Sequence, residues 1–144
     1  MEAKVNMLKK LKNNNGFSLT ELMIAIVIIG VLSMVAIPKF MGTTTKAKLS
    51  EFSPILMQIY SLEEGFFQET DKYATDLKQL DFTDPESKYF DYTLEGDGAG
   101  FVAKATVKVS LKDGQGNDLK GEYVSLNQKK EHGGTENLRR VSRW

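Results

Sequence analysis

The sequence of 144 residues contains no cysteine, one histidine and no excess of either charge. The absence of cysteine excludes a disulfide framework, a thiolate zinc site and a cysteine nucleophile. The single histidine, His132, leaves little scope for histidine-based catalysis or a histidine-rich metal site. Because 19 Lys+Arg balance 19 Asp+Glu, we expect no specific nucleic-acid partner. An apolar content of 41% and a charged content of 26% are typical of a folded domain.

Charge and hydropathy are unevenly distributed at the N-terminus. Residues 1–16 contain four lysines and one glutamate, which gives this segment a net charge of +3. Residues 17–37 (FSLTELMIAIVIIGVLSMVAI) are apolar at 16 of 21 positions. As a helix, this run is about 32 Å long at ~1.5 Å per residue, and the hydrocarbon core of a bilayer is about 30 Å thick. The sequence therefore predicts a segment long enough to span a membrane.

Three interpretations of the apolar run differ in how they explain its composition. A cleaved secretory signal needs small residues three positions and one position before the cut, but Ala36 is preceded by Met34 at the earlier position. A charge costs roughly 2.5–3.5 kcal/mol at the centre of a membrane helix and less near its end, where Glu21 lies, but an ordinary transmembrane anchor gains nothing from it. The third interpretation gives Glu21 a function.

The segment from Gly16 to Glu21 (GFSLTE) resembles the processing site of type IV prepilins and pseudopilins. It combines a short basic leader that ends in glycine, an aromatic residue, a glutamate four residues later and then an apolar run. Gly30 and Pro38 are two further matches. The resemblance implies that a prepilin peptidase cuts between Gly16 and Phe17 and methylates the new amine of Phe17. It also implies that the mature chain polymerises through its apolar helix.

Glu21 is expected to act in assembly through the amine that cleavage creates. A cation and a carboxylate in apolar surroundings each need a partner of opposite charge. Within one helix, Phe17 and Glu21 are four residues apart and could face each other. The resemblance implies instead that Glu21 reaches the Phe17 amine of a neighbouring subunit. That pair would set the axial register of the filament.

The apolar pattern continues beyond the predicted span as an amphipathic helix to residue 70. Phe52, Ile55, Ile59, Leu62 and Phe66 recur at steps of three and four residues and form one apolar stripe. The opposite face is expected to carry polar and charged side chains, namely Lys46, Lys48, Glu51, Gln58, Glu63 and Glu64. The sequence therefore predicts a helix that is apolar all round in its first half and one-sided in its second.

Two prolines lie inside this predicted helix. Pro38 and Pro54 each remove a backbone hydrogen bond and tend to bend a helix. Gly42 and the three threonines that follow it lower the helix propensity between the prolines. We therefore expect a curved or locally meltable stretch around residues 30–45.

Residues 71–144 are predicted to form a globular head built on a β-meander. Thr75 is expected to cap a short helix from Asp76 to Leu80. Three antiparallel strands are predicted at Tyr89–Leu94, Phe101–Leu111 and Glu122–Asn127, separated by glycine-rich turns. The predicted fold class is α+β: a long N-terminal helix packed against a small antiparallel β-sheet, an order of elements that resembles the pilin fold. The polar tail from Gln128 to Trp144 is expected to be solvated, with contact to a partner as the alternative.

The sequence contains no catalytic constellation. The segment from Gly96 to Gly100 lacks the Lys-Ser/Thr pair that a phosphate-binding loop requires. Asp113, Asn117 and Asp118 are weak candidates for a calcium site, because Asp118 stands where a calcium loop needs glycine and Val124 where it needs glutamate. We therefore expect neither enzyme activity nor a cofactor, and no metal site beyond these weak candidates.

Four segments with separate functions are predicted. Residues 1–16 form a leader peptide that is removed, 17–38 a transmembrane and assembly helix, 39–70 its amphipathic half, and 71–144 the head. The resemblance implies a structural subunit of a type IV pilus, with a pseudopilin of a type II secretion system or a minor pilin as the alternative. The exposed loops could serve in adhesion.

The expected partners and location follow from the same resemblance. The partners are other copies of the chain in a helical homopolymer, a prepilin peptidase and methyltransferase, an inner-membrane assembly platform, and membrane lipid before assembly. Because lysine-rich flanks stay in the cytoplasm, the leader is expected inside and Lys39 onward outside a single inner-membrane span. After assembly the chain is expected in an extracellular pilus or a periplasmic pseudopilus.

Overall fold

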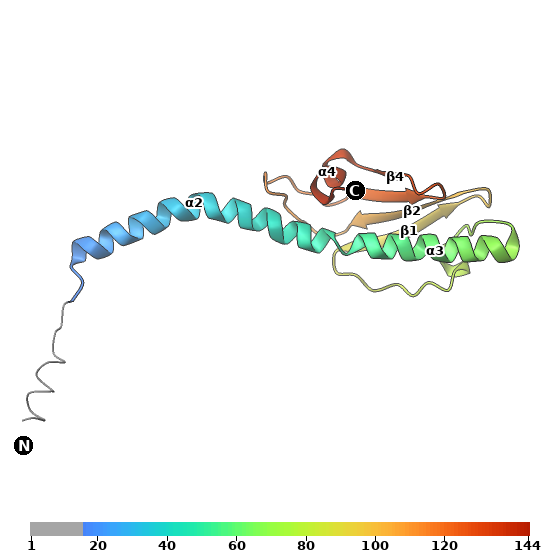
Figure 1. The fold of residues 1–144 in the computed structure, drawn as a ribbon, viewed down its shortest axis with the longest axis horizontal. Helices are drawn as coiled ribbons and strands as arrows, with labels where there is room; N and C mark the ends of the chain where they lie inside the picture. The colour runs from blue at the N-terminus through green and yellow to red at the C-terminus, as the bar shows by residue number, and fades with distance from the viewer. Residues whose placement is uncertain (1–15) are drawn as a thin grey trace, which may run out of the picture. The chain divides into compact units, whose positions relative to one another are not determined.

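The computed structural model describes residues 16–144 (Figure 1). Its elements are, in order, α2 (Leu19–Leu49), α3 (Phe52–Thr70), the 3-10 helix η1 (Leu77–Gln79), β1 (Phe90–Gly96), β2 (Phe101–Val107), β3 (Tyr123–Asn127), β4 (His132–Gly134) and α4 (Glu136–Ser142). The chain divides after Ala36 into two compact units. The second, from Ile37 to Trp144, is called the globular unit below.

The four strands form one antiparallel sheet in the order β1-β2-β3-β4. Phe90 at the start of β1 pairs with Val107 at the end of β2, and the tight turn at their other end joins Gly96 to Phe101. Buried and more exposed residues alternate along β1 and β2, as expected for a sheet with one covered face. The predicted α+β fold and meander are confirmed, but the prediction of three strands is wrong by one.

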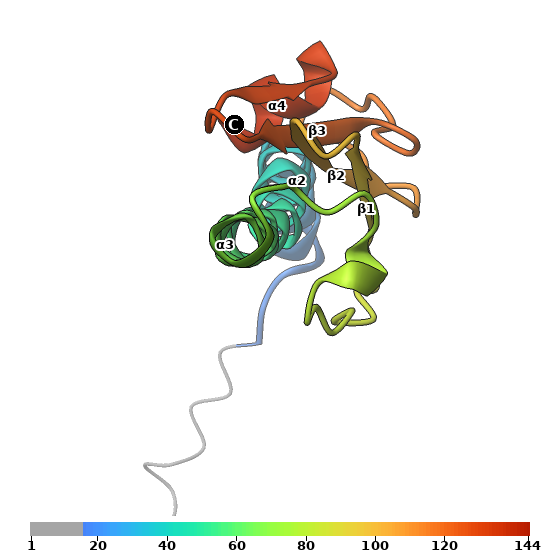
Figure 2. The same cartoon turned by 90° about the vertical axis from the view of Figure 1, so that its right-hand side faces the viewer.

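α3 packs against β2 and β3 on one face of the sheet (Figure 2), and one buried stripe runs from the end of α2 along α3. It is spaced by alternating steps of four and three residues and consists of Thr45, Leu49, Phe52, Leu56, Ile59 and Glu63. The predicted stripe shared only part of this set, since Ile55, Leu62 and Phe66 lie partly buried at its margin. Glu63 was expected on the polar face, but its side chain is fully buried.

The helix does not run without interruption to residue 70. The break falls at Ser50 and Glu51, where the Glu51 N–H reaches back three residues to the Lys48 carbonyl at 3.4 Å. Pro54 explains its position, because proline cannot donate a hydrogen bond to the carbonyl four residues earlier, that of Ser50. Pro38 lies inside α2, which stays helical through the whole stretch from Gly30 to Thr45.

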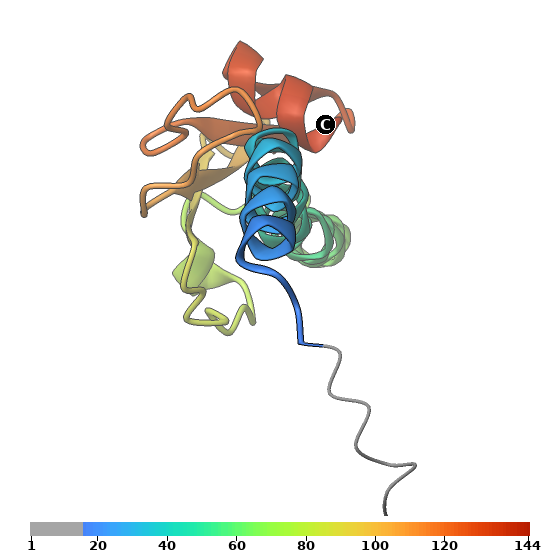
Figure 3. The same cartoon turned by 90° about the vertical axis from the view of Figure 1, so that its left-hand side faces the viewer.

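The C-terminal segment is folded, so the prediction of a solvated tail from Gln128 to Trp144 is wrong. Figures 2 and 3 show α4 beside the β4 side of the sheet, opposite the segment that precedes β1. Leu138 of α4 is fully buried. The Trp144 indole donates to the Ser125 carbonyl at 3.0 Å and stacks on the His132 ring, with centroids 4.0 Å apart. It also meets the ring of Phe52 edge-on, at 5.1 Å.

Two smaller predictions also need correction. The helix expected from Asp76 to Leu80 is the single 3-10 turn η1, and its cap is Asp76, which accepts from the Lys78 N–H, instead of Thr75. The second strand ends at Val107 and not at Leu111. After Val107 the chain turns outward into a loop that closes on itself through a bond from the Leu119 N–H to the Leu111 carbonyl.

Candidate processing and assembly site at the N-terminus

The predicted cleavage bond lies just before the first helix. Gly16, Phe17 and Ser18 have no regular secondary structure, and the Phe17 side chain is 83% exposed. Among residues 16–144, no atom lies within 4 Å of where a Cβ on Gly16 would be. Exposed, irregular backbone is the preferred substrate of proteolytic enzymes. The bond between Gly16 and Phe17 is therefore accessible to a peptidase.

Ser18 and Glu21 cap the N-terminus of α2. The Ser18 carbonyl accepts from the Leu22 N–H at 3.2 Å, which makes Ser18 the residue that begins the helix. Its hydroxyl accepts from the Glu21 N–H at 3.2 Å, while Oε2 of Glu21 accepts from the Ser18 N–H at 2.9 Å. This reciprocal pair is a capping box, which satisfies two backbone donors that the helix itself leaves free.

The capping box was not predicted, although Ser18-Leu19-Thr20-Glu21 carries its S-x-x-E signature. Its geometry changes the expectation that Phe17 and Glu21 face each other within one helix. Phe17 lies outside the helix, so it is not one helical turn away from Glu21 in the uncut chain. Both bonds from Ser18 go to Oε2 of Glu21, and Oε1 accepts none within residues 16–144. One carboxylate oxygen is thus open to another donor.

The apolar side chains of α2 before Pro38 are exposed. Their exposed fractions run from 53% at Ile28 to 83% at Leu19, and a continuous apolar surface of this length is unusual for a water-exposed helix. By length and composition, the helical stretch that begins at Leu19 is suited to cross a membrane, and its apolar window is 0% buried. The first unit therefore needs a covering that the described chain does not supply.

Gly30 and Pro38, the other predicted assembly residues, both lie in α2. A Cβ on Gly30 would meet no atom within 4 Å in the described chain, so packing inside the subunit does not require glycine there. Glycine in an exposed helix costs about 1 kcal/mol relative to alanine. Small residues allow close approach of two helices in apolar surroundings. Gly30 is thus suited to contact a second helix.

The calcium candidates already have hydrogen-bond donors. Asp113 is buried and accepts from the Gln115 N–H at 2.8 Å, the Asn117 N–H at 2.9 Å and the Asn117 amide at 3.0 Å. The Asn117 side-chain bond is the largest reason why the pKa of Asp113 lies below its ordinary value. Asp118 accepts from the Ser110 hydroxyl and the Lys120 N–H. These carboxylates fix the loop, and no group of three or more metal-ligating side chains occurs in residues 16–144.

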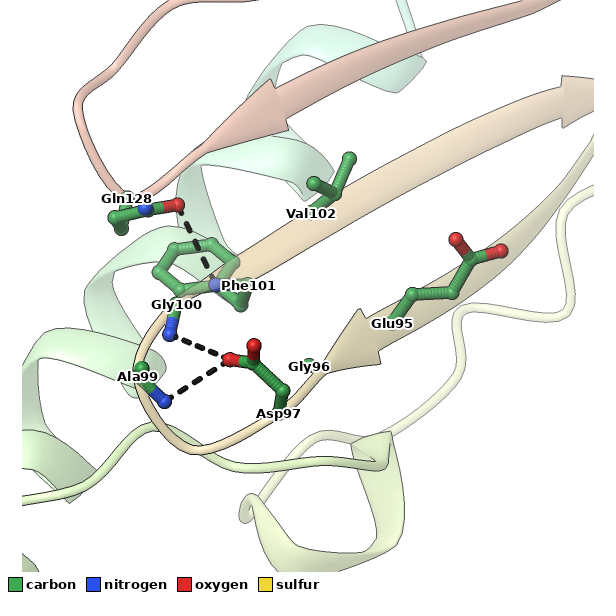
Figure 4. A pocket seen from close by; sticks show the side chains of 8 residues that line it. All are labelled: Glu95, Gly96, Asp97, Ala99, Gly100, Phe101, Val102 and Gln128. Atoms are coloured by element: carbon green, nitrogen blue, oxygen red, sulfur yellow. Dashed lines mark hydrogen bonds between the residues drawn. The ribbon is translucent and has the colours of Figure 1, made fainter.

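A second concave site, of ≈ 500 Å³, lies at the turn between β1 and β2 (Figure 4). Its Asp97 carboxylate accepts from the N–H groups of Ala99 and Gly100, both at 3.0 Å. Gln128 accepts from the Phe101 N–H at 3.4 Å, and Glu95 is paired with Lys104 at 2.6 Å. Its polar groups therefore hold the turn itself.

Known proteins resemble this chain at the N-terminal site and well beyond it. Residues 11–37 match the family model of the prokaryotic N-terminal methylation motif. The chain is 30% identical over 119 residues to a type IV major pilin protein of Neisseria gonorrhoeae, a match that covers 82% of this chain and 70% of that protein. It is 35% identical over 81 residues to a type IV major pilin protein of Myxococcus xanthus. This second match covers 56% of this chain and 37% of the Myxococcus protein.

A solved structure of a type IV pilin from Shewanella oneidensis is also similar, with a TM-score of 0.47 and 17% identity over 65% of this chain and 96% of that one. The methylation motif coincides with the exposed segment, the capping box and the apolar part of α2. The similarity to the Neisseria pilin extends from this region through most of the globular unit. The chain belongs to the type IV pilin family.

Proposed function

We propose that this protein is a structural subunit of a type IV pilus and not an enzyme. The observation that carries the proposal is the apolar surface of α2 before Pro38, which is exposed and preceded by an accessible Gly16–Phe17 bond. Association of such helices removes this surface from water and packs small residues such as Gly30 against neighbours. The mechanism is polymerisation, in which each subunit covers the apolar helices of others.

Processing comes first in the proposed sequence of events. A prepilin peptidase cuts between Gly16 and Phe17 and methylates the Phe17 amine, and the exposure and irregular backbone of this segment support such access. Cleavage removes the basic residues 1–16, of which the structure describes Gly16 alone. It leaves a mature chain that starts one residue before the capping box.

Glu21 connects processing to assembly. The new Phe17 amine is a cation in apolar surroundings, and Oε1 of Glu21 is open to a donor while Oε2 holds Ser18. Pairing of this oxygen with the amine of a neighbouring subunit would fix the axial register. The Ser18 bonds orient the carboxylate for that role.

Before assembly the subunit is held in the inner membrane by residues 17–38, with the leader in the cytoplasm and the globular unit outside. The hydropathy and length of this part of α2 support the anchor. An inner-membrane assembly platform then moves subunits from the bilayer into a pilus on the cell surface.

The test compares Glu21→Ala with Ser18→Ala. Both remove the capping box, which costs about 1 kcal/mol of helix stability, but only the first removes the carboxylate. We expect Glu21→Ala to abolish filaments in electron micrographs of sheared surface fractions, and Ser18→Ala to retain them. Mass spectrometry of the wild-type filament should show loss of residues 1–16 and a methyl group on Phe17.

Glu69→Ala, at an exposed position of α3, is the control and should assemble normally. Filaments of normal yield from Glu21→Ala would refute the pairing. A pseudopilin would be indicated by two results together: the wild type carries no filaments of this chain, and deletion of the chain blocks secretion of other proteins.

A further inference from the structure

Five cations gather where α2 enters the globular unit. Lys39 and Lys46 lie seven residues apart on one side of α2, Lys112 lies on the loop after β2, and Arg140 and Arg143 lie on and directly after α4. All five side chains belong to exposed residues. They are called the basic collar below.

Specific packing brings these three segments together. The Thr45 hydroxyl donates to the Lys112 carbonyl at 2.6 Å. A Cβ on Gly42 would lie 3.0 Å from the Cα of Gly114, so the loop backbone is seated directly on α2. On the other side, Lys46 and Arg143 line the same groove. The collar is therefore a fixed feature of the globular unit.

Acidic side chains neutralise only part of the collar. Asp113 lies 3.8 Å from Arg140, but its oxygens already accept three hydrogen bonds from the loop. Asp118 faces Lys112 across a backbone bridge, and its pKa is lowered chiefly by the Lys120 N–H. Counted over side chains alone, five cations against two carboxylates leave +3. Lys46 and Arg143 form no salt bridge with any side chain of residues 16–144.

The groove between these two cations has a mixed lining of apolar side chains and of the serines Ser50, Ser53 and Ser142. It has a volume of ≈ 600 Å³ and lies between the α2–α3 junction and the C-terminus. Leu49, Phe52, Pro54 and Trp144 line it together with Lys46 and Arg143. Two cations and several apolar side chains in one groove match a molecule with an anionic head and a hydrocarbon chain.

The sequence ties this groove to a bilayer surface. Lys39 follows the end of the apolar run at Ile37 by two residues and Lys46 by nine. Along a helix these steps correspond to about 3 Å and about 14 Å, and the polar layer of a bilayer is roughly 5–8 Å deep on each side. A lysine side chain extends several ångströms further, and charge acts across a Debye length of about 8 Å. Lys39 and Lys46 of the collar thus lie within reach of lipid headgroups.

We propose that the basic collar binds anionic phospholipid in the membrane from which the pilus is assembled, with one headgroup seated between Lys46 and Arg143. The proposal rests on the proposed function, because it requires the chain to be anchored in a bilayer. Lipid held there would keep the globular unit at the membrane surface until assembly. Each cation near an anionic surface contributes about 1 kcal/mol, or roughly a fivefold enrichment of anionic lipid.

The test uses Trp144, the single tryptophan of the chain, which lines the groove. The full chain is reconstituted in vesicles of equimolar phosphatidylcholine and phosphatidylglycerol, with a headgroup-proximal quencher on one lipid or the other. The ratio of Trp144 quenching by labelled phosphatidylglycerol to that by labelled phosphatidylcholine measures enrichment of anionic lipid at the groove. We expect this ratio to exceed one clearly.

Removal of the two groove cations should lower the ratio strongly. Lys46→Gln/Arg143→Gln is expected to bring it down by roughly fivefold or more, towards one. Salt at about 1 M, where the Debye length is ~3 Å, should have the same effect on the wild type. The matched control, Lys72→Gln/Lys129→Gln, removes two exposed cations elsewhere and should leave the ratio unchanged.

Three results would overturn the proposal. The first is a wild-type quenching ratio of one, and the second is a quenching ratio that Lys46→Gln/Arg143→Gln does not change. The third is quenching that depends on the protein-to-lipid ratio but not on which lipid is labelled, which would indicate a second copy of the chain in the groove. Flotation with vesicles of pure phosphatidylcholine at high salt tests the anchor separately. A chain that floats but shows no enrichment refutes the collar alone, whereas a chain that does not float refutes the anchor.

Discussion

Leu32 and Leu56 lie in consecutive helices, but Leu32 is 65% exposed and Leu56 is fully buried. The first belongs to the unit before Ile37, where the apolar side chains of the helix find no cover in the described chain. The second belongs to the globular unit, where a four-stranded sheet covers the same kind of surface. The difference shows that one half of the protein is complete as a monomer and the other half requires partners.

Glu21 and Glu63 show the same difference between the two units for a charged side chain. Glu21 is exposed in an apolar helix and holds Ser18 with one oxygen while the other is open. Glu63 is 0% exposed, and its Oε2 accepts from the Ala74 N–H at 2.9 Å while Oε1 has no partner in the described chain. Within its own subunit Glu63 is closed off, whereas Glu21 is available to another molecule.

Truncation of one leucine in each unit should give the largest difference between the two units. Leu56→Ala creates a cavity in the core and should lower the free energy of unfolding of the globular unit by about 2–5 kcal/mol. Leu32→Ala removes an exposed side chain and should leave that free energy unchanged while weakening filaments. Urea unfolding of the full chain in detergent, with filament yield measured in parallel, separates the two effects. Equal destabilisation by both variants would contradict the division into two units.

A methyl group added to one glycine in each unit should also separate stability from assembly, with a smaller change in the free energy of unfolding. A Cβ on Gly96 would collide with the Ala74 carbonyl oxygen, so Gly96→Ala should destabilise the globular unit by about 1–3 kcal/mol. Gly30→Ala meets open space and should stabilise α2 by up to about 1 kcal/mol. If close helix packing uses Gly30, the same variant should assemble less well. Thermal unfolding and filament counts give the two readouts.

Much of the fold and of the site could be predicted because the signals are local. The exposed cleavage segment, the apolar span and the three long strands are each specified by a run of residues next to one another. The α3 helix is similarly marked by its periodicity of three and four residues. The capping box at Ser18 and Glu21 was also within reach, since its signature is four residues long.

The missed elements depend on contacts between distant segments. β4 is His132-Gly133-Gly134, which has little strand propensity of its own and forms against the edge of β3. α4 has seven residues, too few for a stable isolated helix, and is held by buried Leu138 and by the contacts of Trp144. Because such elements form only against the sheet, their local sequence carries no strong helix or strand signal and resembles a polar tail.

Glu63 was assigned to the wrong face for a related reason. Its position continues the buried stripe through Phe52, Leu56 and Ile59 in steps of four, three and four. A charged side chain at such a position argues for the solvent face, because burying an ion is costly. The backbone N–H of Ala74, supplied by the loop after α3, offsets part of this cost by bonding one carboxylate oxygen.

The smallest expected effect concerns the charge of Glu63 and uses Glu63→Gln. Burial is the largest cause that raises the pKa of this carboxyl above its ordinary value of 4.5; the bond from Ala74 opposes it and the charge of Glu64 adds to it. The folded protein therefore binds this proton more tightly than the unfolded chain does. It follows that the contribution of Glu63 to stability is complete below pH 4.5 and declines as the pH rises through the folded-state pKa.

Glutamine has no proton to release, so Glu63→Gln should remove this decline. The stability of the wild type relative to the variant is expected to fall as the pH is raised from 4.5 towards neutrality. Taking this difference cancels the opposite contributions of Asp113 and Asp118, whose lowered pKa values favour folding above 3.8. Glu69→Gln, at an exposed position, is the control in the same urea titrations. Parallel pH profiles for wild type and Glu63→Gln would mean that this carboxyl reaches water, and that the globular unit is less closed than the comparison with Glu21 requires.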